Sequence, residues 1–129
     1  MNEKNYFLFN NSENPDHWKI SEIILDQCKK YPKREIIEFI DGPKWNFHDL
    51  KIKSLEKAKI LKELGLNEGD NLTVLIEDPK EFILYWIACS FMGVMFVAIN
   101  TAIKEMYYYI KLRHLNQKMF LLKINFCTK

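Results

Sequence analysis

The longest apolar stretch of the chain lies between Asn71 and Asn100. It begins with a run of strand length, Leu72 to Ile76, which is rich in β-branched residues. Asp78-Pro79 is then typical of a helix start, because aspartate caps exposed N–H groups and proline at the first helical position sacrifices no hydrogen bond. Phe82 to Met92 is apolar all round, which predicts a helix buried on every side.

Gly93 divides the apolar stretch, and glycine is the usual residue for the left-handed conformation that ends a helix. Val94 to Ile99 then resumes with β-branched and aromatic residues, so the stretch predicts a strand–helix–strand crossover in a parallel sheet covered on both faces. A rival interpretation is a single membrane-spanning helix, because Phe82 to Ile99 carries no charge and has about the minimum length that a span requires. The complete strand before the helix and the strand-like composition after the glycine favour the crossover.

A helix and a strand are expected upstream. Asp16 can cap a helix that runs to about Lys30, where Tyr31-Pro32 stops it because the residue before proline is disfavoured in a helix. Glu35 to Ile40 is the next strand candidate, and a turn follows at 41–43. Four basic residues surround the helix stop: Lys29, Lys30, Lys33 and Arg34. They predict a solvated helix end whose cations favour the helix dipole, with phosphate binding as the less favoured alternative.

The next helix is expected to begin after Asn46, a good N-cap, with Asp49 three residues later as an approximate capping box. Its buried stripe repeats at helical spacing and comprises Phe47, Leu50, Ser54, Ala58 and Leu61. Gly65 is expected to end this helix, with Leu66 packing back onto it. His48 beside Asp49 invites a catalytic-dyad interpretation, but adjacent residues on a helix do not face each other, so an exposed first-turn histidine is favoured.

Two more elements complete the pattern, a helix from about Ile103 to Leu115 and a third strand at Met119 to Leu122. Three consecutive tyrosines, at 107–109, point in three directions along that helix and cannot form one stacking platform. Packing in the core is therefore favoured over nucleotide stacking.

The composition is that of an ordinary globular protein of one domain, with 129 residues, 28% charged and 48% apolar. A net charge of +2 gives no indication of a nucleic-acid or membrane-surface partner. The three cysteines, Cys28, Cys89 and Cys127, show neither metal-ligand spacing nor a disulfide framework. Together with an N-terminus that lacks a signal-peptide pattern, they predict a reducing, cytoplasmic location.

Several segments taken in order resemble the N-terminal part of AMP-forming acyl-CoA synthetases. They are KWNFHDL, then LKELGLNEGDNLTVLIEDPKEFILYWIACSFMGVMFVAINTAIKEMYYYI, then KMFLL. The resemblance covers about Trp18 to Leu122. Its most specific part is the order and spacing of Leu64-Gly65, Gly69-Asp70, Pro79, Glu81-Phe82, Gly93 and Asn100. Ala98 stands where the family often has proline.

The resemblance implies an α/β fold, namely an incomplete parallel-sheet βαβ layer from the N-terminal subdomain of an adenylate-forming enzyme. The expected organisation is a loose N-terminal arm at 1–16, a partial AMP-binding (adenylation) domain at 17–122 and an unpatterned tail at 123–129. In the full-length family a carboxylate attacks the α-phosphate of ATP, and coenzyme A then takes the acyl group from the adenylate. ATP, magnesium and coenzyme A are thus implied for the whole enzyme, and no cofactor is expected in this fragment.

The residues that perform this chemistry are not expected in this chain. Adenylation needs a phosphate-cradling loop rich in glycine, serine and threonine, whereas the four glycines here, at 42, 65, 69 and 93, are never within three residues of one another. The family's Tyr-Gly-x-Thr-Glu segment, its ribose-binding aspartate and its C-terminal lysine would all lie beyond Lys129. No catalytic, cofactor-binding or metal-binding residue is therefore assigned.

Three functional hypotheses follow. The favoured one is a truncated or split acyl-CoA synthetase, in which this chain is an inactive scaffold awaiting the missing remainder of the enzyme. The second is a non-catalytic interaction module that pairs with a separate catalytic fragment or self-associates through an open sheet edge. The third is a small membrane protein that spans the bilayer once at Phe82 to Ile99.

Overall fold

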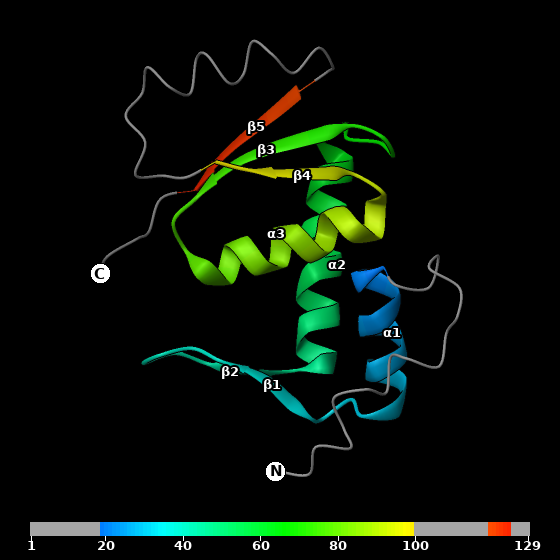
Figure 1. Cartoon of the computed structure of the whole chain (residues 1–129), viewed down its shortest axis with the longest axis vertical. Coiled ribbons are helices and arrows are strands. Elements are labelled where there is room, and N and C mark those ends of the chain that lie inside the picture. The colour runs from blue at the N-terminus through cyan, green and yellow to red at the C-terminus, as the bar shows by residue number, and fades with distance from the viewer. Residues whose placement is uncertain (1–18, 100–118, 125–129) are drawn as a thin grey trace. The chain divides into compact units, whose positions relative to one another are not determined.

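The computed structural model describes residues 19–99 and 119–124 (Figure 1). The chain divides into two compact units, Met1–Ile52 and Lys53–Lys129, with the boundary inside helix α2 (Phe47–Glu63). Each unit is described by itself below.

The first unit begins with helix α1 (Ile20–Lys30), which ends directly before Tyr31-Pro32 as the sequence predicts. Lys19 occupies the N-cap position and makes no side-chain capping bond, while the predicted cap Asp16 lies outside the described residues. The side of α1 turned from solvent carries Ser21, Ile24, Gln27 and Cys28.

A β-hairpin follows α1. Strand β1 (Glu35–Glu38) is two residues shorter than predicted, and it pairs antiparallel with β2 (Lys44–Asn46). The turn falls at 41–43 as expected, with Asp41 in the left-handed region at a φ of 53°. Strand β2 was not predicted, because its three residues lack any alternating run. What fixes β2 is the buried Trp45, whose ring packs edge-on against Phe39 with the centroids 4.7 Å apart.

Helix α2 begins with a capping box that is more complete than the sequence suggests. The Asp49 N–H donates to Asn46 Oδ1 over 2.8 Å, and the Asn46 N–H donates to Asp49 Oδ2 over 3.3 Å. The shorter aspartate therefore reaches its partner as the usual glutamate does, so two otherwise unpaired N–H groups are satisfied.

The C-terminal end of α2 is a Schellman motif. Gly65 adopts a φ of 91°, its N–H donates to the Lys62 carbonyl, and the Leu66 N–H donates to the Leu61 carbonyl. Leu66 is fully buried, as predicted, and the predicted stripe of α2 is buried at Leu50 and at three residues of the second unit, Ser54, Ala58 and Leu61.

The second unit contains a parallel sheet of three strands in the order β4-β3-β5. Its elements are β3 (Asn71–Ile76), α3 (Pro79–Met92), β4 (Met95–Ala98) and β5 (Met119–Ile124). The predicted crossover is confirmed by β3, α3 and β4, and the predicted third strand is confirmed by β5, which runs two residues further than expected. The predicted helix at 103–115 and its tyrosines lie outside the described residues.

Helix α3 begins and ends where the sequence predicts. Asp78 Oδ1 accepts from the Lys80 N–H over 2.8 Å, Pro79 occupies the first turn, and Gly93 takes the left-handed conformation at a φ of 67°. The interpretation of Phe82 to Ile99 as one membrane-spanning rod is therefore wrong, since the helix stops at Met92 and a strand follows. None of the helices that the structure describes is long and apolar enough to cross a membrane.

The core of the second unit lies between α3 and one face of the sheet. Leu72, Val74 and Ile76 from β3 pack there, together with Ala58, Leu61, Leu66, Tyr85, Ala88, Cys89 and Val94. The expectation that α3 is buried on every side is only partly met, because Trp86 on its outer side is 45% exposed. Leu84 and Ile87 of α3 are also buried, although they lie outside this core cluster, so Trp86 is the exception within the apolar part of the helix. Likewise β3 is buried on both faces but β4 is not.

Candidate functional site

The carboxyl edge of the parallel sheet is the place where a ligand site is expected. In open parallel sheets ligands bind outside the carboxyl ends of strands, where successive crossovers leave in opposite directions. In this unit that position is beside β3, because β4 and β5 lie on opposite sides of it. Glu77 and Asp78 follow β3 directly, and the Glu77 N–H donates to the Ile124 carbonyl of β5 over 3.1 Å.

The chemistry of this edge does not suit a nucleotide phosphate. A helix N-terminus can bind an anion through its exposed N–H groups and its dipole. At α3, however, the Asp78 carboxylate already accepts a hydrogen bond from the Lys80 N–H, and the charge of Glu81 in the first turn is paired with Lys57. Because this cap already uses one of the N–H groups that a phosphate would need, the described residues at this edge do not fit the phosphates of the ATP that the resemblance implies for the whole enzyme.

A part-buried ion pair connects α2 to α3. Lys57 Nζ lies 2.6 Å from Glu81 Oε2, with side-chain exposures of 21% and 26%, and it also lies 5.2 Å from the centre of the Tyr85 ring. Burial raises the pKa of the Tyr85 hydroxyl, and the neighbouring Lys57 charge partly offsets this rise. The charges in this cluster neutralise one another, so its role is to hold two helices together. The sequence gives no local sign of it, since Lys57 and Glu81 lie in different elements.

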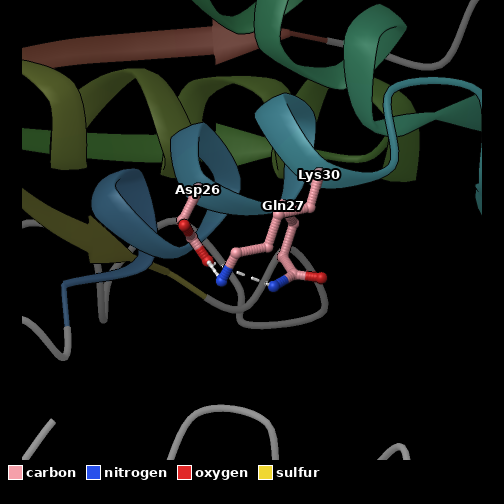
Figure 2. Close-up of polar contacts among 3 residues, drawn as sticks. All are labelled: Asp26, Gln27 and Lys30. Carbon is pink, nitrogen blue, oxygen red and sulfur yellow. Dashed lines mark hydrogen bonds and ion pairs between the residues drawn. The ribbon is translucent and has the colours of Figure 1, made fainter. Parts of the chain in front are cut away.

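The basic residues around the end of α1 form an exposed group. The Asp26 carboxylate accepts hydrogen bonds from Lys30 Nζ over 2.8 Å and from Gln27 Nε2 over 3.3 Å. Figure 2 shows these three side chains together. The hydrogen bond from Lys30 is the main reason why the pKa of Asp26 lies below its usual range. Lys29, Lys33 and Arg34 are exposed as well. This arrangement is the solvated helix end that the sequence favours, and one of its cations is already compensated.

His48 and Asp49 do not form a catalytic dyad. His48 is exposed on the first turn of α2, as predicted, while the Asp49 carboxylate is engaged with the Asn46 N–H. A base that orients a catalytic histidine must be hydrogen-bonded to its ring, and this carboxylate is a helix cap instead.

The described thiols are buried rather than poised for reaction. Cys28 and Cys89 are both free and buried, and burial raises the pKa of Cys89 to about 12. The nucleophilic form of cysteine is the thiolate, so Cys89 is inert near neutral pH. Within residues 19–99 and 119–124, no group of three or more histidine, cysteine, aspartate or glutamate residues is placed to hold a metal ion.

Comparison with known proteins identifies the family. The family model described as AMP-binding enzyme matches residues 24–121. The chain belongs to this family. The resemblance to the N-terminal part of AMP-forming acyl-CoA synthetases is thereby confirmed.

The curated relatives of this AMP-binding chain are ligases that are much longer than it is. It is 32% identical over 90 residues to a 2-succinylbenzoate–CoA ligase of Oceanobacillus iheyensis, covering 70% of this chain and 18% of the relative. It is 27% identical over 86 residues to a long-chain-fatty-acid–CoA ligase of Bacillus subtilis, covering 67% and 15%. The chain therefore spans less than a fifth of these relatives.

Solved structures show the same fold. The N-terminal subdomain of Klebsiella oxytoca NpsA superposes with a TM-score of 0.75 at 20% identity, covering 85% of this chain and 28% of that one. The O-succinylbenzoate coenzyme A synthetase of Bacillus subtilis, solved with ATP and magnesium ion, gives a TM-score of 0.72 at 22% identity, covering 79% and 27%. The predicted fold class, an incomplete parallel βαβ layer of an adenylate-forming N-terminal subdomain, is confirmed.

Proposed function

We propose that this chain is the scaffold portion of a truncated or split AMP-dependent acyl-CoA synthetase and that it is inactive by itself. The observation that carries the proposal is the family match over residues 24–121 in a chain that spans 18% of its 2-succinylbenzoate–CoA ligase relative. The acidic carboxyl edge beside Glu77 and Asp78 supports it, because those residues cannot cradle a phosphate. In this proposal ATP, magnesium and coenzyme A bind to the remainder of the enzyme.

A direct assay tests the inactivity. Purified residues 1–129 are expected to show no ATP–pyrophosphate exchange with any member of a panel of aromatic and aliphatic carboxylic acids. The Bacillus subtilis synthetase serves as the positive control under the same conditions. Exchange above background contradicts the proposal if it persists when the chain is purified further.

A chimera tests the scaffold role. Residues 24–121 replace the aligned segment of the Oceanobacillus iheyensis ligase, and the chimera is expected to retain measurable exchange with 2-succinylbenzoate. A matched chimera that carries Leu61→Asp, which places a charge at a fully buried core position, is expected to lose both folding and exchange. A chimera that folds by circular dichroism but shows no exchange counts against the scaffold role.

The cytoplasm is the location that we propose. The free, buried thiols of Cys28 and Cys89 support a reducing compartment, where disulfides are rare. Fractionation of cells that express the chain, followed by its detection with an antibody, tests this location. Recovery of the chain in an oxidising compartment contradicts it.

A second candidate function is a non-catalytic interaction module. The observation that favours it is the exposure of β4, an outer strand of the described sheet. In this case the chain binds a separate catalytic fragment, and affinity capture of that fragment with tagged residues 1–129 is the expected result. The absence of any captured ligase fragment contradicts this second candidate.

A further inference from the structure

The tip of the β1–β2 hairpin carries the sequence Asp41-Gly42-Pro43. The Gly42 N–H donates to the Phe39 carbonyl over 3.0 Å and closes a β-turn, in which Asp41 has a φ of 53°. All three residues of the tip are exposed, and Ile40 before them is 96% exposed. The side chain and the peptide bond of Asp41 are therefore open to water in the folded chain.

An aspartate that precedes glycine can react with its own backbone. The nitrogen of the following peptide bond attacks the side-chain carboxyl carbon, and a water molecule leaves as a succinimide ring closes. Water then opens the ring at either of its carbonyl groups, which gives back aspartate or leaves isoaspartate, whose backbone continues through the side-chain carbon. Water lost on closure is regained on opening, so the net change is an isomerisation without any oxidant or reductant. The attack is intramolecular, and glycine offers it no side-chain obstruction.

We propose that Asp41 is converted to isoaspartate in the folded chain. Asp41-Gly42 is the only Asp-Gly pair in the sequence. The described sheet of this unit has two strands only, and a hairpin of that size is marginally stable, so local opening frees the Gly42 N–H from the Phe39 carbonyl. Because the tip is exposed, the backbone at Asp41 can rotate for ring closure without displacing a buried side chain.

Other aspartates of the described chain are placed less favourably for this reaction. Asp26 lies inside α1, where the helical backbone holds the next peptide nitrogen in place, and the residue that follows it is the buried Gln27. Asp78 precedes Pro79, whose nitrogen carries no hydrogen to lose. Asp26 therefore serves as an internal reference for Asp41.

Isoaspartate adds a carbon atom to the backbone of the turn. The Phe39 N–H donates to the Pro43 carbonyl over 3.3 Å, and the Phe39 ring packs against Trp45 with the centroids 4.7 Å apart. Both contacts depend on the length of the connection through Asp41. The modified chain is therefore expected to have a looser hairpin than the unmodified one.

Ageing of the purified full chain at physiological temperature and neutral pH, followed by digestion with trypsin, tests the proposal. Trypsin cuts after Arg34 and Lys44, so residues 35–44 form one peptide. A second form of this peptide with the same mass is expected to accumulate and to give the fragment ions of isoaspartate. It is also expected to accept a methyl group from S-adenosylmethionine in the presence of an isoaspartyl methyltransferase. The peptide of residues 20–29, which contains Asp26, is expected to remain a single form.

Asp41→Glu is the matched control, because it keeps the carboxylate but would have to close a larger ring, which forms far more slowly. The aged variant is expected to lose the second form of the peptide. Amide hydrogen exchange in residues 35–44 is expected to become faster on ageing in the wild-type chain and to stay unchanged in the variant, each compared with its own fresh sample.

Two results overturn the proposed modification. One is an aged chain with no more isoaspartate at Asp41 than the fresh chain, and the other is isoaspartate that forms only when the chain is aged in urea. Hydrogen exchange that stays unchanged in a chain shown to contain isoaspartate at this position overturns the expected loosening of the hairpin.

Discussion

Thr73 carries a buried hydroxyl that costs the fold stability. It lies in the middle of β3, paired in register with Val97 of β4 and Leu121 of β5, and it is 0% exposed. Its Oγ1 has no hydrogen-bond partner in the part of the chain that the structure describes. A hydroxyl that leaves water without gaining a partner costs about 1–3 kcal/mol in proteins. Thr73→Val replaces it by a methyl group of nearly the same volume and shape.

We therefore expect Thr73→Val to raise the free energy of unfolding by about 1–3 kcal/mol, or the melting temperature by roughly 3–12 °C. Urea denaturation followed by far-UV circular dichroism measures the change. Valine is also at least as favourable as threonine in a strand, so no propensity cost opposes the gain.

Thr73→Ser is the matched control for this substitution. It keeps the hydroxyl and removes the methyl group, so it is expected to lower stability by about 1 kcal/mol. The expected order of stability is valine, then threonine, then serine. If the valine variant is less stable than the wild type, the hydroxyl makes a favourable interaction and the reasoning from its isolation is refuted.

Three further predictions concern other parts of the second unit. Lys57→Met leaves the Glu81 carboxylate part-buried without its partner and is expected to cost about 1–3 kcal/mol in urea denaturation, whereas an unchanged midpoint contradicts it. Burial raises the pKa of the Cys89 thiol from 9.0 to about 12 and so keeps it protonated in the folded chain. The free energy of unfolding is therefore expected to be unaffected by this thiol below pH 9.0 and to fall by about 1.4 kcal/mol per pH unit as the pH rises from there toward about 12. Cys89→Ala should remove this slope, and a slope identical to that of the wild type refutes the assignment. Gly93→Ala forces a side chain into the left-handed region and within 2.9 Å of Glu68 Cγ, and a cost of about 1–2 kcal/mol is expected in the same denaturation assay, with no loss as the refuting result.

The sequence predicts those elements whose boundaries depend on local chemistry. The Asp78 cap and Gly93 fix the ends of α3, and Gly65 with Leu66 fixes the end of α2, because each involves backbone groups a few residues apart. Strand β2 was missed for the opposite reason. It exists because Trp45 packs against Phe39 across a hairpin, and a contact of this kind leaves no periodic pattern in three residues.

Burial was the less predictable quantity. An apolar helix such as α3 suggests burial all round, but the pattern does not say how many layers are present, and Trp86 is exposed. The ion pair of Lys57 with Glu81 likewise depends on how two helices pack, which no spacing in the chain encodes. The absence of a glycine-rich phosphate loop was readable from the sequence, because such a loop is a contiguous motif.

In the proposed function, the capped N-terminus of α3 is the reason why the described residues at this edge do not bind the nucleotide themselves. A phosphate site at α3 would require a free helix N-terminus, but Asp78 makes the capping bond that defines where this helix starts. Asp78→Ala would expose that N-terminus and remove a negative charge, and its expected cost is about 1 kcal/mol of stability. Isothermal titration with ATP and magnesium is expected to show no binding to the wild-type chain or to this variant, because one helix end with Lys80 in its first turn supplies no second row of backbone donors. ATP binding gained by Asp78→Ala would show instead that the cap alone withholds a phosphate site, and the assignment of nucleotide binding to the remainder of the enzyme would then be wrong.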